Sequence, residues 1–421
     1  MMDSSKRQVL LDVLKNKINR QLLYYLDICA RCAICRDACH QFAVTKDITY
    51  MPAYRAELIR RIYKKNISPF GKMFPKMFEG KEIDYEKLLD GLYKATYACT
   101  GCRRCMVYCP FSIDTAWVLS AAKEILNAAG KGNEILGELA DAAIMKGESM
   151  DIFREILVET LKDSETELKE KLGDKSATIP IEVEGADMLY VALAGTHTII
   201  PAAMIFNKAK KSWTLSLFEA ANYGYFLGDS KKAKKIADRI IDEAKKLKVK
   251  EIVVTECGHA YRVLKFLYEA WAKEKLPFKI RGFVELVAGY IKDGDIKLKE
   301  GNVEIPVTYH DPCQVGRNAG FYDEPRFIIN KIARDFRDLN PAKARNWCCG
   351  GGGGLVAMPE FEDLRLKTGK LKYEQIKKTG AKIVVTPCEN CRLQIGNLNE
   401  HYSMGIEISS MMDFVADNMV T

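Results

Sequence analysis

Five cysteines in the last third of the chain have types and spacing that suit one metal centre. They are the single thiol Cys313, the adjacent pair Cys348 and Cys349, and the C-x-x-C pair Cys388 and Cys391. Five thiols are too many for one tetrahedral zinc ion, which takes four ligands. Adjacent cysteines bind two neighbouring irons of a cluster more comfortably than they chelate one ion. The pattern therefore predicts an iron–sulfur centre that involves all five thiols.

A run of glycines, from Gly350 to Gly354, follows the adjacent pair. Without a Cβ atom, glycine lets backbone N–H groups approach cluster sulfurs closely, so we assign Gly350 and Gly351 to cluster binding. The run lacks the Gly-Lys-Ser/Thr ending of a P-loop and the spacing of a dinucleotide fingerprint. We therefore do not expect nucleotide binding at this loop.

Eight further cysteines form two equal runs of the type C-x-x-C-x-x-C-x-x-x-C in the N-terminal half. The runs are Cys29, Cys32, Cys35 and Cys39, and then Cys99, Cys102, Cys105 and Cys109. Two such runs are the bacterial ferredoxin signature, in which the fourth cysteine of each run ligates the cluster of the other run. We therefore predict two cubane [4Fe–4S] clusters. One is assigned to Cys29, Cys32, Cys35 and Cys109, and the other to Cys99, Cys102, Cys105 and Cys39.

The elements that carry these runs read as helices. Apolar residues recur at helical spacing, and Asp114 is a candidate N-cap. The expected helices are residues 9–28, 54–66, 85–95 and 114–128. A charged amphipathic segment at 147–172 is expected to be a solvated connector, and Gly173 and Pro180 bracket the expected domain boundary. The sequence thus predicts a helical, two-cluster ferredoxin-like domain over residues 1–172.

The C-terminal half repeats one pattern. Residues 252–257 and 383–388 each read as a buried strand that ends in a cysteine, after charged helices at 231–247 and 362–378. Upstream, the strand at 190–194 corresponds to the strand at 307–309. These repeats predict a duplicated α/β domain over residues 180–421, with a first repeat at 180–300 and a second at 301–421. The overall class is α+β, with sites at the C-terminal ends of strands.

The five-cysteine spacing resembles the CCG domain of the heterodisulfide reductase family. The catalytic subunit of that family holds a non-cubane iron–sulfur cluster with five such cysteines. The match covers most of the chain, because the D-type polypeptide of the family also begins with a ferredoxin-like region. Within the family, the chain most resembles the cytoplasmic iron–sulfur subunit of the Tmc-, Hmc- and Dsr-type transmembrane redox complexes of sulfate reducers.

The resemblance implies a function and a set of partners. The chain would pass electrons between a membrane-bound cytochrome or quinone-reactive subunit and a thiol or disulfide substrate, either a small molecule or a small protein. It would belong to a hetero-oligomeric complex. The third cofactor would be one CCG-type [4Fe–4S] cluster of the non-cubane kind.

The first repeat departs from the family, in which heterodisulfide reductases have a complete cysteine set in both repeats. The positions of the other ligands carry Thr196, Asn222, Tyr223 and Ala260, and only Cys257 remains. We therefore expect one CCG cluster. Cys257 is a buried relic, a redox thiol near the cluster, or an extra ligand. His259 could donate a proton to Cys257 or cap a turn.

One histidine stands close to the predicted centre. His310 precedes Cys313 by three residues. It could supply the proton that a leaving thiolate requires, or it could be a structural histidine that is hydrogen-bonded below the loop. We name His310, with the five CCG cysteines, as a candidate catalytic residue.

Two other functions fit the same motifs. The chain could be a pure electron relay within a complex, with a fully ligated CCG cluster and no substrate. It could also be the iron–sulfur subunit of a lactate or glycolate oxidase, whose chemistry belongs to a flavin on another chain. The incomplete first repeat favours the relay more than a complete reductase would.

Length, cysteine content and charge limit the alternatives. The chain has 421 residues, enough for two domains, and its 14 cysteines without a signal-peptide pattern favour metal ligation over disulfides. Residues 1–110 hold 20 Lys and Arg against 11 Asp and Glu, out of a net charge of +8 for the chain. This excess is a docking face for an acidic partner or an anionic membrane, or it is counter-charge for the clusters.

Location and excluded partners follow from what the sequence lacks. The most apolar stretch, residues 189–206, is interrupted by His197 and Pro201, so we expect no membrane span. No motif indicates nucleic-acid binding, flavin or haem. We expect a cytoplasmic protein, peripheral on the inner face of the membrane.

Overall fold

The computed structural model of the protein describes residues 4–74, 84–147, 152–193 and 196–420. The chain divides into two compact units, and each unit is built from three separate segments. Unit 1 comprises Met1–Glu138, Tyr223–Ser230 and Trp347–Lys372, and unit 2 comprises Leu139–Asn222, Lys231–Asn346 and Tyr373–Thr421. Across these described ranges, every helix is too short or too polar to traverse a bilayer.

Unit 1 is helical throughout its described residues. From the N-terminus, its elements are α1 (Ser4–Lys17), α2 (Arg20–Asp27), η1 (Ile34–Arg36), α3 (His40–Thr45), η2 (Ile48–Tyr50), α4 (Pro52–Asn66), α5 (Pro69–Met73), α7 (Tyr85–Tyr97), α8 (Arg104–Tyr108) and α9 (Thr115–Ala128). The two later segments add α14 (Tyr223–Leu227), η6 (Leu355–Ala357), η7 (Pro359–Phe361) and α20 (Glu362–Thr368). Helices α10 (Glu134–Met145) and α21 (Lys370–Thr379) span positions at which the division falls.

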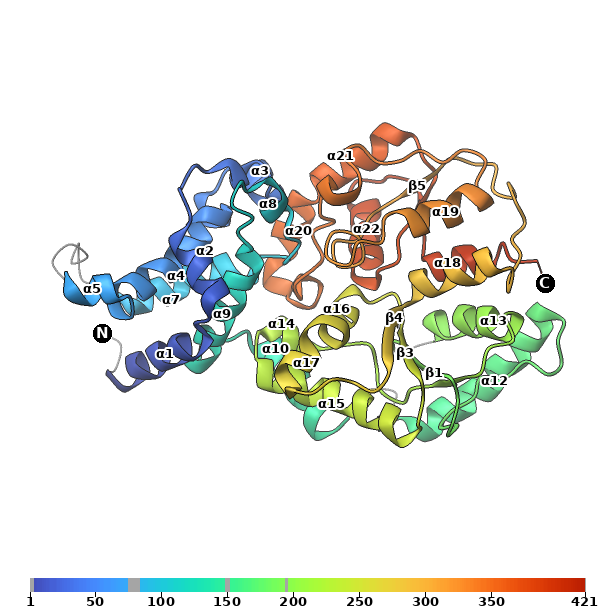
Figure 1. Cartoon of the computed structure of the whole chain (residues 1–421). Helices are drawn as coiled ribbons and strands as arrows, with labels where there is room; N and C mark the ends of the chain where they lie inside the picture. Colours follow the sequence, from blue (N-terminus) through green and yellow to red (C-terminus); the bar gives the residue numbers. More distant parts are fainter. Residues whose placement is uncertain (1–3, 75–83, 148–151, 194–195, 421) are drawn as a thin grey trace. The chain divides into compact units, whose positions relative to one another are not determined.

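Local sequence signals explain where these helices begin. The predicted N-cap is confirmed, because the Asp114 carboxylate accepts a hydrogen bond from the backbone N–H of Trp117. The single helix expected over residues 9–28 is wrong. The side chain of Asn19 accepts from the N–H of Leu22, so it caps a new helix and separates α1 from α2. Helix α9 packs against α1, α4 and α7 (Figure 1).

The core of unit 1 includes residues from all three of its segments. Phe226 and Leu227 of α14 are buried there, as are Leu355, Met358 and Phe361 of the last segment. The orange-red helix α20 accordingly lies beside the blue helix α3 (Figure 1). This division differs from the predicted boundary between 172 and 180, because apolar side chains far along the sequence complete the core of unit 1.

Unit 2 alternates helices with short strands. Its elements are α12 (Arg154–Leu172), β1 (Met188–Val191), η3 (Thr196–Thr198), α13 (Ile200–Lys208), β2 (Trp213–Leu215), α15 (Ser230–Lys246), β3 (Glu251–Val254), α16 (Gly258–Arg262), the π-helical turn η4 (Val263–Leu267), α17 (Tyr268–Ala272), β4 (Lys279–Gly282) and α18 (Phe283–Asp293). The second half adds β5 (Val307–Tyr309), α19 (Asp323–Ile332), η5 (Lys343–Arg345), β6 (Ile383–Val385), α22 (Glu389–His401), β7 (Glu407–Ser409) and α23 (Met411–Ala416).

The strands of unit 2 form two parallel sheets, in the orders β2-β1-β3-β4 and β5-β6-β7. The series β1-β3-β4 matches β5-β6-β7. Where β2 pairs with β1, a parallel bridge joins Phe336 to Val307 of β5. The repeat predicted from the sequence thus has the same strand order in both halves. Ala194 and residues 148–151, which belong to the predicted strand and connector, lie outside the described residues.

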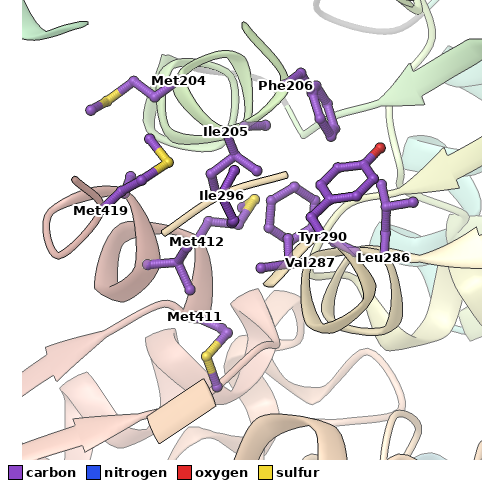
Figure 2. Close-up of a cluster of buried hydrophobic side chains, with 14 of the residues drawn as sticks. Met204, Ile205, Phe206, Leu286, Val287, Tyr290, Ile296, Met411, Met412 and Met419 are labelled. Atoms are coloured by element: carbon purple, nitrogen blue, oxygen red, sulfur yellow. The ribbon is translucent and has the colours of Figure 1, made fainter. Parts of the chain in front are cut away.

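Two helices of unit 2 join its core in ways that matter for the site. Helix α12 buries Leu161, Leu168 and Leu172, so its described part is a packed helix and the expected solvated connector is wrong. Figure 2 shows Met411 and Met412 of α23 among apolar side chains from α13 and α18. Burying each of these methionines stabilises the unit by roughly 1.5–3 kcal/mol. Helix α23 therefore ties the second repeat to helices of the first.

Candidate iron–sulfur centres

The first crossed set of four cysteines comes together in unit 1. All four line one pocket, whose wall also includes Ala30, Ala33 and Ala53. The members of the set are Cys29, Cys32, Cys35 and Cys109. Burial raises the pKa of the Cys35 thiol to about 11, and the other three thiols of the set contribute in the same direction. Such thiols need a positive partner to be held as thiolates, which is what cluster irons supply.

The second crossed set gathers in the same way. Burial raises the pKa of Cys39, and the thiols of Cys102 and Cys99 raise it further. Burial likewise raises the pKa of Cys105 well above its usual value, with Cys102, Cys99 and Cys39 as its thiol neighbours. The fourth cysteine of the first run therefore lies with the first three of the second run, and Cys109 lies with the first three of the first run.

The backbone of the two runs is also equivalent. Arg31 and Gly101, each two residues after the first cysteine of its run, have φ of 55° and 65°. Ala33 and Arg103, four residues after it, have φ of 61° and 58°. A left-handed conformation costs an ordinary residue roughly 1–2 kcal/mol. Turns of this type point successive N–H groups into a concavity that suits anions and iron–sulfur clusters. The residues present therefore fit [4Fe–4S] clusters.

The Cys348–Cys349 pair lies in unit 1 and packs on the second run. The Sγ atom of Cys348 is 3.4 Å from the hydroxyl of Thr100, and both thiols of the pair are buried. The N–H groups of Gly350 and Gly351 point to the Sγ atoms of Cys348 and Cys349, each over 3.4 Å. The glycine loop thus places backbone donors on both sulfurs.

Arg104 connects three cysteine-bearing stretches within unit 1. It precedes Cys105, and it donates a 2.9 Å hydrogen bond to the carbonyl of Ala38, next to Cys39. Its guanidinium also lies 3.5 Å from the ring centroid of Trp347, next to Cys348. A buried cation over an indole ring is stabilised by roughly 2 kcal/mol. Arg104 therefore holds the CCG pair against both ferredoxin-type runs.

Lys123 of α9 supports the glycine loop from below. Its ammonium donates to the carbonyls of Phe226 and Gly353 and lies 4.8 Å from the ring centroid of Tyr97. Burial lowers the pKa of Lys123 to about 8. The lysine therefore links all three segments of unit 1.

Gly353 is expected to be intolerant of any side chain. Its φ is 72°, and a Cβ there would come 2.5 Å from the carbonyl oxygen of Cys99. We expect Gly353→Ala to destabilise the protein by more than the roughly 1–2 kcal/mol of a left-handed alanine, because backbone atoms must move. Gly130→Ala is the matched control, since Gly130 has a φ of 70° and nothing within 4 Å of its Cβ position. Equal losses in urea denaturation would contradict the close approach.

The other three predicted CCG ligands lie in unit 2, at the C-terminal ends of two neighbouring strands. Cys313 follows β5, Cys388 is the N-cap residue of α22 after β6, and Cys391 lies in the first turn of that helix. All three are buried. A helix N-terminus stabilises a thiolate. The five predicted ligands are therefore divided between the units, three in unit 2 and two in unit 1.

His310 is buried at the end of β5 and is held by Asn346. The Asn346 amide N–H₂ lies 3.3 Å from His310 Nδ1 and 3.0 Å from the carbonyl oxygen of Asp311. Because the amide nitrogen can only donate, His310 Nδ1 accepts, and a neutral imidazole carries its proton on Nε2. Arg317 donates to the carbonyls of Ala344 and Asn346. It positions the chain that leads into the CCG pair.

Cys257, in the first repeat, lies beside the second repeat. It is the N-cap of α16, as Cys388 is of α22. Burial, with a smaller contribution from Cys388, raises the pKa of Cys257 to about 12. The Asn390 amide lies 3.4 Å from His259 Nδ1. The two repeats therefore bring equivalent helix starts together, and Cys257 remains next to a predicted ligand.

Glu256 fixes this junction of the repeats from within the core. Its carbonyl accepts a 2.9 Å hydrogen bond from the N–H of Glu389, and its carboxylate accepts from the N–H groups of Met411 and Met412. Burial raises the pKa of Glu256 well above its usual range. The start of α22 is thus positioned by the first repeat.

Comparison with known families agrees with this division of motifs. Residues 25–113 match the family described as 4Fe-4S dicluster domain, and residues 307–396 match the family described as cysteine-rich domain, CCG. Both crossed cysteine sets fall within the first match, and the five CCG cysteines fall within the second. The chain is a heterodisulfide reductase D-like iron–sulfur protein.

Relatives match along nearly the full chain. The chain is 28% identical to the Hdr-like menaquinol oxidoreductase iron-sulfur subunit 2 of Archaeoglobus fulgidus, over 98% of this chain and 83% of the relative. A second relative, the Hdr-like menaquinol oxidoreductase iron-sulfur subunit of Archaeoglobus profundus, shows the same figures. The chain is 24% identical to the D-type polypeptide of the dihydromethanophenazine:CoB–CoM heterodisulfide reductase of Methanosarcina mazei, over 94% of each chain.

Sequence reasoning missed several residues around these centres. Arg104, Asn346 and Lys123 act through contacts with segments distant in the sequence, and no local pattern marks them. His40 did leave a signal. In the repeated motif the fourth cysteine of the second run is followed by Pro110, the usual residue, whereas Cys39 is followed by a histidine.

Proposed function

We propose that the chain is an electron-transferring oxidoreductase subunit that connects a membrane-bound redox partner to a thiol or disulfide substrate. Electrons would enter at the set that contains Cys32, whose side chain is exposed, and pass to the set that contains Cys102. The observation that carries the proposal is the packing of Cys348 and its glycine loop on the second run. The proposed relay therefore reaches the CCG pair within one compact unit.

The five CCG thiols are proposed to hold one cluster. Asn346 is fastened to His310 and Asp311, and Cys348 follows Asn346 by two residues. Since successive Cα atoms are ~3.8 Å apart, the Cα atom of Cys348 is at most about 7.6 Å from that of Asn346. Chain connectivity thus keeps the CCG pair near the strand end that carries Cys313.

Each proposed role belongs to named groups. The proposed clusters, when bound, take up and release electrons singly. Gly350 and Gly351 direct N–H groups at the CCG sulfurs, and we assign His310 Nε2 the proton for a leaving thiolate. The relatives named menaquinol and dihydromethanophenazine oxidoreductases support a quinone-reactive or cytochrome partner in a membrane complex. The chain would bind it peripherally, on the cytoplasmic face.

A second function, the pure relay, is favoured by the first repeat. Where a second cluster would need ligands, Asn222 donates to the carbonyl of Ala233 and Tyr223 begins α14. These residues serve the fold. One CCG centre without a partner centre suits electron relay as well as disulfide chemistry.

Electron paramagnetic resonance separates the two functions. The oxidised, anaerobically purified protein would be measured before and after addition of a small dithiol, unlabelled and labelled with a magnetic sulfur isotope. We expect a new signal that broadens with the label, because substrate sulfur would bind at the CCG cluster. An unchanged spectrum from protein that contains all three clusters would favour the relay.

A further inference from the structure

His40 occupies a buried position between the second cysteine set and the CCG pair. It is the first residue of α3 and directly follows Cys39, and only 3% of its surface is exposed. The equivalent position of the second run carries Pro110, which has no side-chain donor. The two runs therefore differ where the first one faces the CCG pair.

The immediate neighbours of the imidazole are sulfur atoms. A ring nitrogen of His40, Cys102 Sγ and Cys348 Sγ all lie within 4.8 Å of one another. Cys102 belongs to the second ferredoxin-type set, and Cys348 belongs to the CCG pair. All three residues lie in unit 1. The imidazole is thus placed where sulfur ligands of two proposed clusters approach each other.

The Nε2 atom of His40 has no hydrogen-bond partner among the described residues. A buried polar group left without a partner costs roughly 1–3 kcal/mol. The next residue, Gln41, is also buried, but its amide donates to the carbonyl of Ala98 and its oxygen accepts from Arg55. The helix start therefore satisfies Gln41 with protein groups and leaves His40 Nε2 facing sulfur.

We propose that His40 Nε2–H donates a hydrogen bond to a sulfur at this junction and raises the reduction potential there. The inference rests on the proposed function, because the acceptor is a sulfur of the Cys102 cluster or of the CCG cluster. Hydrogen bonds to cluster sulfurs stabilise the reduced, more negative state. His40 is a positioning residue that makes electron transfer between the two clusters more favourable.

The surroundings hold the imidazole in this place. Arg104 bonds the carbonyl of Ala38 and stacks on Trp347, and Thr100 contacts Cys348 Sγ. The three residues His40, Cys102 and Cys348 do not by themselves make a zinc site, because zinc takes four ligands. Hydrogen bonding to sulfur therefore explains the geometry without reassigning either cysteine.

The test is a redox titration of anaerobically purified full-length protein, followed by electron paramagnetic resonance. In His40→Leu we expect the midpoint potential of the Cys102 cluster, of the CCG cluster or of both to become more negative. The potential of the cluster at Cys29 and Cys32 should stay unchanged, and so should the iron content. His40→Gln keeps a donor near the position of Nε2 and should restore the potential at least in part.

Gln41→Leu is the matched control. It removes buried hydrogen bonds from the same helix start, so it should lower the thermal midpoint but leave all potentials in place. Unchanged potentials in His40→Leu would overturn the inference. Loss of iron in both His40 variants would also overturn it, since His40 would then be a ligand or a structural residue. Failure of the proposed function would instead appear in the unmodified protein, as a missing third cluster.

Discussion

Cys349→Ser is expected to remove the CCG cluster and to leave both ferredoxin-type clusters intact. The unmodified protein should carry about 12 iron atoms, four for each of three clusters, and the variant about eight. Cys349 is buried, and its Sγ atom accepts from the N–H of Gly351. A serine hydroxyl is a harder ligand that suits cluster iron poorly in place of a soft thiolate. Iron analysis and electron paramagnetic resonance measure both quantities.

Cys257→Ser is the matched control for this experiment. Cys257 is equally buried and lies beside Cys388, but it belongs to the repeat that lacks the other ligands. It should retain about 12 iron atoms. Loss of all clusters in Cys349→Ser would show that the cluster assignment is wrong. Retention of every iron would exclude Cys349 from the ligands.

The two ferredoxin-type centres could be predicted from the sequence to the level of individual cysteines. Three closely spaced thiols need a fourth from elsewhere, and the equal spacing of the two runs offers Cys109 to one set and Cys39 to the other. The structure brings these sets together. The strand order of the two repeats could also be predicted, because buried strands ending in Cys257 and Cys388 are local patterns.

The packing of distant segments could not be predicted in this way. The core of unit 1 takes Phe226 from the first repeat and Phe361 from the second, and nothing local to either residue specifies that partner. The stacking of Arg104 on Trp347 and the hydrogen bond from Asn346 to His310 are of the same kind. Pattern and spacing report local geometry, whereas these contacts depend on the whole fold.

The same distinction explains why the site combines strong and weak signals. Cysteine ligands must be thiols, so their identity and spacing remain readable in the sequence. The residues that orient them need only a donor, a ring or a charge at the right point, and many side chains supply one. His40 became visible only because a repeated motif supplied its own reference, Pro110.

Arg326→Ala is expected to destabilise unit 2 by about 3–5 kcal/mol, the usual cost of leaving a buried charge without its partner. The Arg326 guanidinium makes two 2.9 Å hydrogen bonds to Asp311, whose side chain is only 1% exposed. It also donates to Asp338 over 2.7 and 2.9 Å. Without Arg326, the Asp311 carboxylate keeps only neutral donors, such as the N–H of Lys343.

The position of Asp311 extends this effect to the proposed cluster. Asp311 stands two residues before Cys313, and its carbonyl accepts from Asn346, which precedes the CCG pair by two residues. Weakening this anchor should therefore also speed the loss of the CCG cluster. Arg326→Lys should fall between the wild type and Arg326→Ala, because an ammonium keeps the charge but not the bidentate geometry.

Arg334→Ala supplies the matched control for Arg326→Ala. Arg334 pairs with Glu304 over 2.8 Å, but both side chains are about two-thirds exposed, at 66% and 70%. Such a pair contributes about 0–1 kcal/mol. Urea denaturation under anaerobic conditions, followed by tryptophan fluorescence, compares the two variants. Equal losses would mean that water reaches Asp311 and that Arg326 does not anchor the strand end at Cys313.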